Sequence, residues 1–499
     1  MRLAWRRRAV TGSSAVAIAL GTLLLDPSRG EARPPLPICL PCVCTACPVL
    51  HAWPTDPPPC DASSTLQACI DAAAPGDGVL IETDGPIDES ISFSKGLSLG
   101  AGSGYHPVFS SSRSILATSS TSGDQTIRIQ GLRLQEGSIE IMQKSTGVLT
   151  AQVLDNWVRT SVGSIYPGVL IYQPGQTGPV SFDVSGNLVQ VSESAPHGQT
   201  GIAFSGSAAA TGTVEHNEIV VDPGDQATGI SVGDSDDFTI DVIANDVYGT
   251  GYNQGISLEA LGATTARILD NLVTGQAGHV AGPGAISIYA SGSLQATVVN
   301  NTLPYNAEGV TAETLPGSSS LVITNNAVTA NSFAGFSLTL DHSTTLAQDH
   351  NLFYANGVDI ESVTAVMPGP RSVFANPNYQ GPGDYRIVAP SPAIDAGDDA
   401  AVPPDLDTDF GGNPRIQGSH VDIGAYEVAP EPAGGLGAAA AVLVLHALGA
   451  RARGRARPGS SVRWSGALTM GPWGRARRSR ARAIAAAAAD ASAGASGVS

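Results

Sequence analysis

Lysine is almost missing from this 499-residue sequence, where it occurs only at Lys95 and Lys144. Aromatic residues make up 5% of the chain and charged residues 14%, whereas glycine occurs 58 times. Long amphipathic helices are nearly absent, and the best candidate is the short segment 63–74. These shortages argue against a helical bundle or a coiled coil and favour a chain built from strands and turns.

Basic residues of both kinds are scarce in the body of the chain. Residues 33–432 contain 41 acidic and 11 basic residues, which gives a net charge of −30. A surface this negative repels nucleic acid and anionic lipid and attracts cations. It therefore argues against nucleic acid as a partner, and it fits either extracellular calcium binding or a solubilising role.

Eight asparagines recur through the middle of the chain at intervals of 25 to 31 residues, which is the period of one coil of a solenoid. An apolar residue stands two places after each asparagine, and the residue between them varies freely. This alternation is typical of a corner followed by a β-strand. The asparagines are Asn156, Asn187, Asn217, Asn245, Asn271, Asn301, Asn326 and Asn351.

A column of small residues stands upstream of each asparagine, at the start of an apolar strand pattern. In five of its seven members, 16 residues separate the small residue from the next asparagine. The distance from an asparagine to the next small residue varies more, so one side of each coil is regular and the other carries the insertions. The members are Gly168, Gly201, Gly229, Gly255, Ala285, Gly309 and Gly335.

Elementary backbone chemistry explains these residue types. Glycine and asparagine tolerate the left-handed conformation that a sharp corner requires. Asparagines at the same corner of successive coils can also form an amide ladder at a spacing of about 4.8 Å. Inward apolar residues then fill a core that no single coil could bury alone. We therefore interpret the asparagines as structural, not catalytic.

The predicted fold is all-β, a right-handed parallel β-helix of about ten coils over residues 61–373. The segment 63–74 is expected to form a short helix that caps its N-terminal end, because an open solenoid end needs a cover.

The two ends of the chain indicate export. Residues 1–32 combine an arginine-rich start, an apolar run and small residues near position 30, which predicts a signal peptide. Residues 433–450 carry no charge, and ten arginines follow between residues 451 and 482. This order predicts a transmembrane or sorting segment at 433–450 and a disordered Arg/Ala-rich tail at 451–499.

The protein is accordingly expected at the cell surface or outside the cell, held to the membrane by its C-terminal segment. A nucleic-acid-binding role for the arginine tail is the alternative, but it requires the tail to be separated from an exported body.

All six cysteines lie between residues 39 and 69. An even number of cysteines in an exported chain favours disulfides, and Cys60 and Cys69 could pair across the start of the capping helix. The other four lie in the Cys/Pro-rich segment 33–60 with CxxC spacing, which in an exported stalk favours cross-linking over zinc. They are Cys39, Cys42, Cys44 and Cys47.

Several ordered blocks near the C-terminal end resemble a known domain. They are FANPNY (374–379), GDYRI (383–387), SPAIDAG (391–397), GNPR (412–415) and VDIGAYE (421–427). Through them, residues 374–428 resemble the choice-of-anchor Q domain, which closes pectate-lyase-like β-helices on bacterial surface proteins. Gly411 departs from the pattern, because many relatives have a second aspartate there. The APEP sequence at 429–432 and the segments after it are similar to the PEP-CTERM sorting signal, although this chain continues to residue 499.

A parallel β-helix does not by itself choose between an enzyme and a non-catalytic protein. A lyase needs a base beside a cation-binding carboxylate cluster, and Arg159 and Arg267 are the only basic residues between positions 156 and 366. A glycosidase needs two facing carboxylates, for which the best acidic run is 234–237, near Asp241. We interpret this run as a solvated turn and predict no catalytic residue.

Two functional hypotheses remain. The first is an exported, surface-anchored protein that binds or organises extracellular polysaccharide, or acts as a surface rod. The second is a divergent calcium-dependent polysaccharide lyase or glycosidase that uses the insertion-bearing face.

Calcium is the one cofactor for which the sequence offers a candidate site. Asp405, Asp407 and Asp409 alternate in a glycine-rich turn, and this spacing can direct several oxygens at one hard cation. Phe410 and Ile416 stand where an EF-hand has its glycine and its bidentate glutamate, so the segment is not an EF-hand. We expect weak calcium binding here, with a solvated acidic loop as the alternative.

Overall fold

The computed structural model describes residues 48–160, 166–175, 177–192, 199–234, 236–276 and 284–429. The predicted signal peptide, the four cysteines at 39–47, the segment 433–450 and the tail 451–499 lie outside the described residues. Within the described ranges, no helix has both the length and the apolar character needed to cross a membrane.

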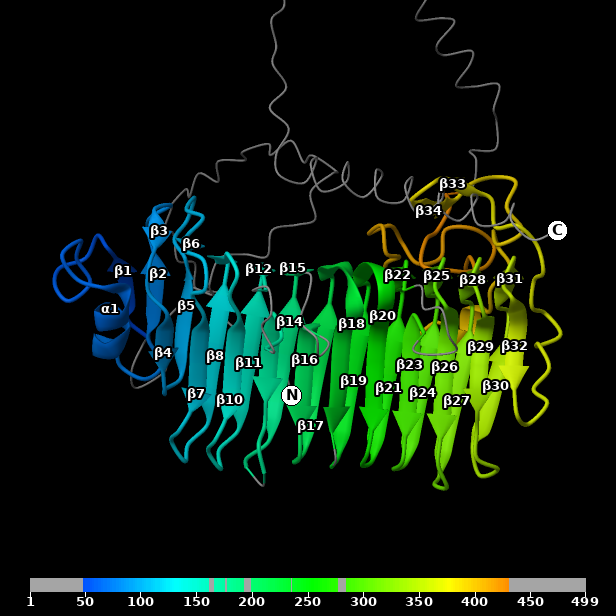
Figure 1. Ribbon diagram of the computed structural model, residues 1–499, viewed down its shortest axis with the longest axis horizontal. Helices are drawn as coiled ribbons and strands as arrows, with labels where there is room; N and C mark the ends of the chain where they lie inside the picture. The colour runs from blue at the N-terminus through cyan, green and yellow to red at the C-terminus, as the bar shows by residue number, and fades with distance from the viewer. Residues whose placement is uncertain are drawn as a thin grey trace, which may run out of the picture. The chain divides into compact units, whose positions relative to one another are not determined.

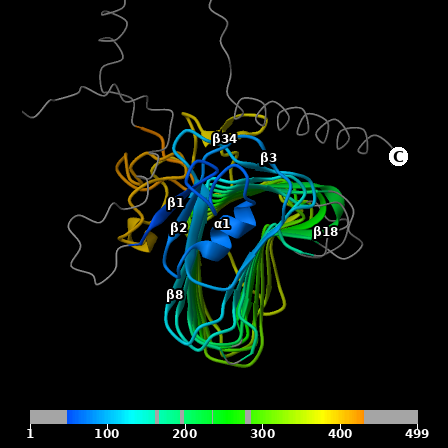
Figure 2. The same cartoon turned by 90° about the vertical axis from the view of Figure 1, so that its left-hand side faces the viewer.

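The described chain winds into a parallel β-helix of about 11 coils (Figure 1). Each coil passes through three columns of parallel strands, and these columns enclose the core when viewed along the stack (Figure 2). This architecture confirms the predicted fold class.

The first column, here called sheet A, contains 12 strands. They are β1 (Leu50–Trp53), β2 (Gly78–Ile81), β5 (Leu97–Ala101), β8 (Gln125–Gln130), β11 (Leu149–Leu154), β14 (Val180–Ser185), β17 (Ala210–Glu215), β19 (Phe238–Ile243), β21 (Thr264–Leu269), β24 (Leu294–Val299), β27 (Ser319–Thr324) and β30 (Thr345–Asp349).

The second column consists of short strands that follow the ladder corner. They are β3 (Pro86–Ile87), β6 (Val108–Phe109), β9 (Arg133–Leu134), β12 (Trp157–Arg159), β15 (Leu188–Val191), the first parts of β18 (Glu218–Asp234) and β20 (Asp246–Ala260), β22 (Leu272–Thr274), β25 (Thr302–Pro304), β28 (Ala327–Thr329) and β31 (Leu352–Tyr354).

The third column returns the chain toward sheet A. Its strands are β4 (Ile91–Phe93), β7 (Ile115–Ser119), β10 (Ile139–Gln143), β13 (Val169–Tyr172), β16 (Thr200–Gly206), the second parts of β18 and β20, β23 (Ile286–Ala290), β26 (Glu308–Thr314), β29 (Ala334–Thr339) and β32 (Val358–Ser362).

The eight predicted asparagines lie in one hydrogen-bonded column at the corner between sheet A and the second column. From Asn156 to Asn326, the backbone N–H of each donates to Oδ1 of the asparagine in the next coil at 2.9 to 3.1 Å. The side-chain Nδ2 donates to the same Oδ1 and to a backbone carbonyl of the preceding coil. Each buried amide is thereby satisfied along the stack.

The left-handed conformation at this corner belongs to the residue before each asparagine, so our assignment of it to the ladder asparagine is wrong. The φ angle is 55° at Asp270, 58° at Asn300 and 60° at Asn325, whereas the ladder asparagines are not among the residues with positive φ. The ladder therefore selects asparagine for its amide alone, and the corner before it accepts several residue types.

A second amide ladder, which was not predicted, runs along the next corner of the later coils. Asn306 N donates to Asn331 Oδ1 at 2.9 Å, and Asn331 N donates to Asn356 Oδ1 at 3.1 Å. Gln276 begins the column by donating its backbone N–H to Asn306 Oδ1. Each member stands five residues after a ladder asparagine, which is the sequence signal that could have revealed it.

The glycine column serves close packing, and our interpretation of it as a set of left-handed corners is also wrong. A Cβ added to Gly201 would lie 2.7 Å from the carbonyl oxygen of Gly229 and 2.8 Å from Cγ2 of Ile219. Gly201 and the other glycines of this column are not among the glycines with positive φ. These positions require small residues because the backbone of the next coil and side chains of the second column lie within contact distance of them.

Helix α1 (Leu66–Ala72) lies over the N-terminal end of the core, as the cap prediction requires (Figure 2). Its buried face includes Leu66 and Ile70. Glu89 accepts from the first helical N–H groups, and Lys95 donates to carbonyls at the other end, so both charges complement the helix dipole. Cys69 of this helix forms a disulfide with Cys60, which precedes the helix.

Residues 374–428, here called the C-terminal segment, pack against the later coils. The segment contains the hairpin β33 (Tyr379–Gly381) and β34 (Asp384–Ile387) and the short 3-10 helix η1 (Asp399–Ala401). Ile387, Ala393 and Ile423 form an apolar cluster with Ala327 and Leu352 of the second column. The segment thus closes one side of the β-helix near its C-terminal end.

Candidate functional site

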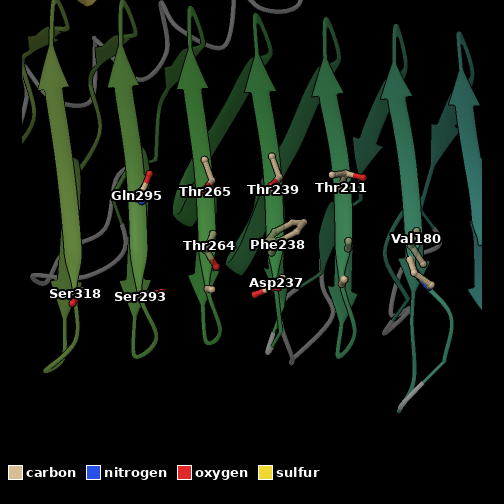
Figure 3. A pocket seen from close by; sticks show the side chains of 14 residues that line it. Val180, Thr211, Asp237, Phe238, Thr239, Thr264, Thr265, Ser293, Gln295 and Ser318 are labelled. Atoms are coloured by element: carbon tan, nitrogen blue, oxygen red, sulfur yellow. The ribbon is translucent and has the colours of Figure 1, made fainter.

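A groove of about 670 Å³ crosses the beginnings of six neighbouring sheet A strands, β14 to β27 (Figure 3). Fourteen residues line it, and each coil contributes them from its turn into sheet A or from the first positions of the strand. They are Pro179, Val180, Ala209, Ala210, Thr211, Asp237, Phe238, Thr239, Ala263, Thr264, Thr265, Ser293, Gln295 and Ser318.

An outward-facing line of hydroxyl and amide side chains, here called the polar row, runs across sheet A through this groove. Its members pair in register from one strand to the next, one per coil, at the usual strand spacing of about 4.8 Å. Four of them, Thr211, Thr239, Thr265 and Gln295, line the groove at one level (Figure 3). The polar row consists of Thr150, Ser181, Thr211, Thr239, Thr265, Gln295, Ser320 and Thr345.

Tight turns leave room for the groove. Gly262 and Gly292 stand in the turns before β21 and β24, and a Cβ added to either would strike a carbonyl of the preceding coil. The turns therefore carry no side chain at these points and stack closely. Below the groove, Phe182, Phe204 and Phe238 stack with ring centroids 4.6 and 5.1 Å apart, which fills the core beneath.

Among the described residues, the buried hydroxyl of Thr264 in the groove has no hydrogen-bond partner. Thr264 is 3% exposed, and its Oγ1 makes no hydrogen bond within the described residues. Ser319, which is 4% exposed and two coils further along the same register position, has an equally unpartnered hydroxyl but is not a lining residue. A buried polar group without a partner costs free energy, and a bound polar ligand relieves that cost.

Asp237 is the one charged residue among those that line the groove. None of the 14 is basic. Asp234 and Asp236, the other acidic residues of this run, are not lining residues. Asp234 is 1% exposed and accepts from the Asp236 N–H. The candidate glycosidase run thus places one carboxylate in the groove and no second carboxylate facing it among the lining residues.

Arg267, the basic residue considered for a lyase, lies two positions beyond Thr265 on β21 and is held by carboxylates on two sides. Its guanidinium donates to both oxygens of Asp241 at 2.7 and 2.5 Å and to both oxygens of Asp405 at 2.7 Å. The hydrogen bonds that Arg267 donates to Asp241 chiefly, and to Asp405, raise its pKa above the ordinary value. A raised pKa is the opposite of what a general base requires.

The three aspartates considered for calcium do not gather around one point. Asp405 pairs with Arg267, whereas Asp409 is 2% exposed and accepts from the N–H groups of Asn413 and Glu427. Among the described residues, no three His, Cys, Asp or Glu side chains lie where they could share a metal ion. The structure therefore offers no geometry in support of this site.

A buried ion cluster joins the C-terminal segment to the β-helix. Arg415 donates to Asp270 Oδ1 at the ladder corner and to Glu427 Oε1, both at 2.6 Å, and its side chain is 2% exposed. Burial raises the pKa of Glu427 to about 7 and that of Asp422 to about 6, and it raises the pKa of Asp270 as well. Burial opposes the charge of Arg415, but Asp270 and Glu427 raise its pKa.

Two of the sequence blocks in residues 374–428 supply the residues that dock this segment onto the β-helix. Arg415 ends the GNPR block, and Glu427 ends the VDIGAYE block. Asn300 and Asn325 at the same corner donate to carbonyls of Asp422 and Asp398 at 3.0 Å. The cluster is a structural lock between the segment and the coils.

Comparison with known proteins agrees with the fold. Residues 200–367 match a family model described as a right handed beta helix region. Among solved structures, the chain is similar to pectate lyase Pel9A, with a TM-score of 0.42 and 13% sequence identity over 77% of this chain and 97% of that chain. No curated protein matches the chain significantly. The family match identifies the parallel β-helix as right-handed.

The groove was not predicted, although the sequence contains a signal for it. A serine, threonine or glutamine stands six residues before every ladder asparagine, and this column is the polar row. The column is hard to see because its residue type changes among Ser, Thr and Gln. Each of these is also common on the outward face of any strand.

Proposed function

We propose that the protein binds an extended polysaccharide along the groove of sheet A and does not cleave it. The observation that carries this proposal is the polar row, which presents one hydroxyl or amide group per coil across the groove. A polysaccharide also repeats its hydroxyl groups along its length. Its hydroxyl groups can therefore form hydrogen bonds with the polar row over several coils.

The charged groups near the groove favour binding over cleavage. A lyase requires a base that can lose its proton, and Arg267 is held in its charged form by Asp241 and Asp405. A glycosidase requires two carboxylates across the scissile bond, and Asp237 is the one carboxylate that lines the groove.

We further propose that the protein is exported and held at the cell surface. The predicted signal peptide at 1–32, the resemblance of residues 374–428 to choice-of-anchor Q domains and the apolar segment 433–450 support this location. The docked C-terminal segment would then stand between the β-helix and the anchor. In this arrangement the groove faces extracellular glycan.

Binding and cleavage can be separated in one assay. The purified body, residues 33–430, is incubated with a panel of neutral and uronic-acid glycans while retention, reducing ends and unsaturated products are measured. We expect retention on at least one glycan without new products. Thr239→Val with Thr265→Val should weaken binding by about tenfold, because two hydrogen bonds are lost.

Thr339→Val is the matched control, because Thr339 is exposed on β29, outside the groove. Equal loss of binding in the control would assign the effect to general damage. Formation of products would favour the alternative of a divergent lyase or glycosidase.

A further inference from the structure

We propose that the groove accepts an uncharged polysaccharide and rejects polyuronates, and that Asp237 makes this distinction. The inference rests on the proposed glycan binding and names the ligand class for the same groove.

The lining matches sugar hydroxyls and offers nothing to a sugar carboxylate. Its polar groups are hydroxyls and an amide together with the carboxylate of Asp237, and no lining residue carries a positive charge. Sugar hydroxyls can donate to Asp237 and exchange hydrogen bonds with the threonines. A uronate would instead place a second negative charge beside Asp237 without a cation to compensate it.

The basic side chain on β21, two positions beyond the polar row, cannot serve a uronate. Arg267 already directs Nε and Nη2 to Asp241 and Nη1 to Asp405. One guanidinium with two carboxylates carries a net negative charge. A uronate that approached it would have to displace a carboxylate that the fold already supplies.

The unpartnered hydroxyl of Thr264 independently indicates a ligand. It is 3% exposed, lines the groove and lacks a hydrogen-bond partner within the described residues. A neutral hydroxyl is suited to satisfy it, because a hydroxyl can both donate and accept. The neighbouring lining positions carry the short side chains of Ala263 and Thr265.

Coil spacing sets the direction of the ligand. The coils repeat at about 4.8 Å, which is close to the length of one pyranose unit in an extended chain. A polysaccharide that runs across the strands from β14 to β27 would therefore meet one turn of the β-helix with each sugar unit.

The test compares calorimetric affinities of the purified protein for neutral oligosaccharides (cello-, xylo- and manno-series) and for galacturonate and guluronate oligosaccharides of equal length. We expect at least one neutral series to bind and the uronates to bind at least about tenfold more weakly. Asp237→Asn should raise uronate affinity by about tenfold and change neutral affinity much less.

Asp236→Asn serves as the control, because Asp236 is the exposed neighbour that does not line the groove. The inference is overturned if uronates bind the wild type as tightly as neutral chains, or if Asp237→Asn leaves the ratio unchanged. Binding to neither class of oligosaccharide would instead refute the proposed glycan binding. Binding to both classes with equal affinity would refute only the proposed preference for uncharged chains.

Discussion

At the residue scale, a single buried amide performs three tasks in each coil. In Asn271, Oδ1 accepts two hydrogen bonds from Asn245, the backbone N–H donates to Asn301, and Nδ2 donates to Asn301 and to the Val242 carbonyl. No other short side chain offers both an acceptor and two donors in this position. The column was predictable from sequence for this reason.

Replacement of Asn271 by leucine should lower the free energy of unfolding by about 1 to 3 kcal/mol, because buried donors and acceptors of adjacent coils lose their partners. Denaturant titration measures the change. Glu259→Leu, on the exposed face of β20, is the control and should change stability by less than about 0.5 kcal/mol. Equal stability of wild type and Asn271→Leu would contradict the ladder's energetic role.

Thr264 should show opposite effects on stability and binding. Thr264→Val removes an unpartnered buried hydroxyl, so we expect unchanged or higher stability of the free protein together with weaker glycan binding. Ser319→Ala removes a similar hydroxyl outside the groove and should leave binding unchanged. A loss of binding in both variants, or in neither, would argue against a ligand role for Thr264.

At the element scale, the docking of the C-terminal segment depends on charges brought together from distant parts of the sequence. Arg415 and Asp270 are 145 residues apart and meet in the core of the contact. Sequence spacing cannot reveal such a pair, because it depends on how the segment folds back over the coils. The ordered blocks signalled a resemblance, but the docking role of their arginine and glutamate required the structure.

Docking should weaken as the pH rises. The docked Glu427 has a pKa of about 7 against an ordinary value of 4.5, and Asp422 has about 6 against 3.8. At a pH between the ordinary and the raised pKa of each carboxyl, the docked segment keeps a proton that the undocked segment has lost. Undocking therefore becomes easier as the pH increases toward about 7. Hydrogen-exchange protection of residues 374–428, corrected for intrinsic rates, measures this dependence.

Glu427→Gln should reduce the pH dependence above about pH 6, because the amide does not titrate and Asp422 alone of the two carboxyls remains. Glu361→Gln, at an exposed position of β32, should leave it unchanged. Protection that increases with pH over this range would contradict the assignment of raised pKa values to the docked carboxyls.

At the scale of the whole molecule, periodicity made the β-helix predictable, whereas the groove and the docked segment depend on contacts between coils. The spacing of Asn156 and its successors was sufficient for the coil, because one repeated amide fixes the register. The left-handed conformation was assigned one residue too late. The residues that adopt it, such as Ala244 and Asp270, differ in type from coil to coil and so leave no pattern in the sequence. The openness of the groove depends on how turns such as that of Gly262 stack, which no single repeat reveals.

The proposed anchor is tested by truncation. If the segment 433–450 holds the protein at the membrane, deletion of residues 431–499 should release the body into the medium in a soluble form. Fractionation of cells and medium measures the distribution. Retention of the truncated protein in the membrane fraction would contradict the proposed anchoring.

Binding of a polysaccharide across successive coils is tested by measuring affinity as a function of ligand length. Calorimetric titration with a neutral oligosaccharide series should show affinity that rises with each added sugar until about six units, the number of strands that border the groove. Affinity that is already constant from the disaccharide onward, or that is not detected at any length, would contradict binding across successive coils.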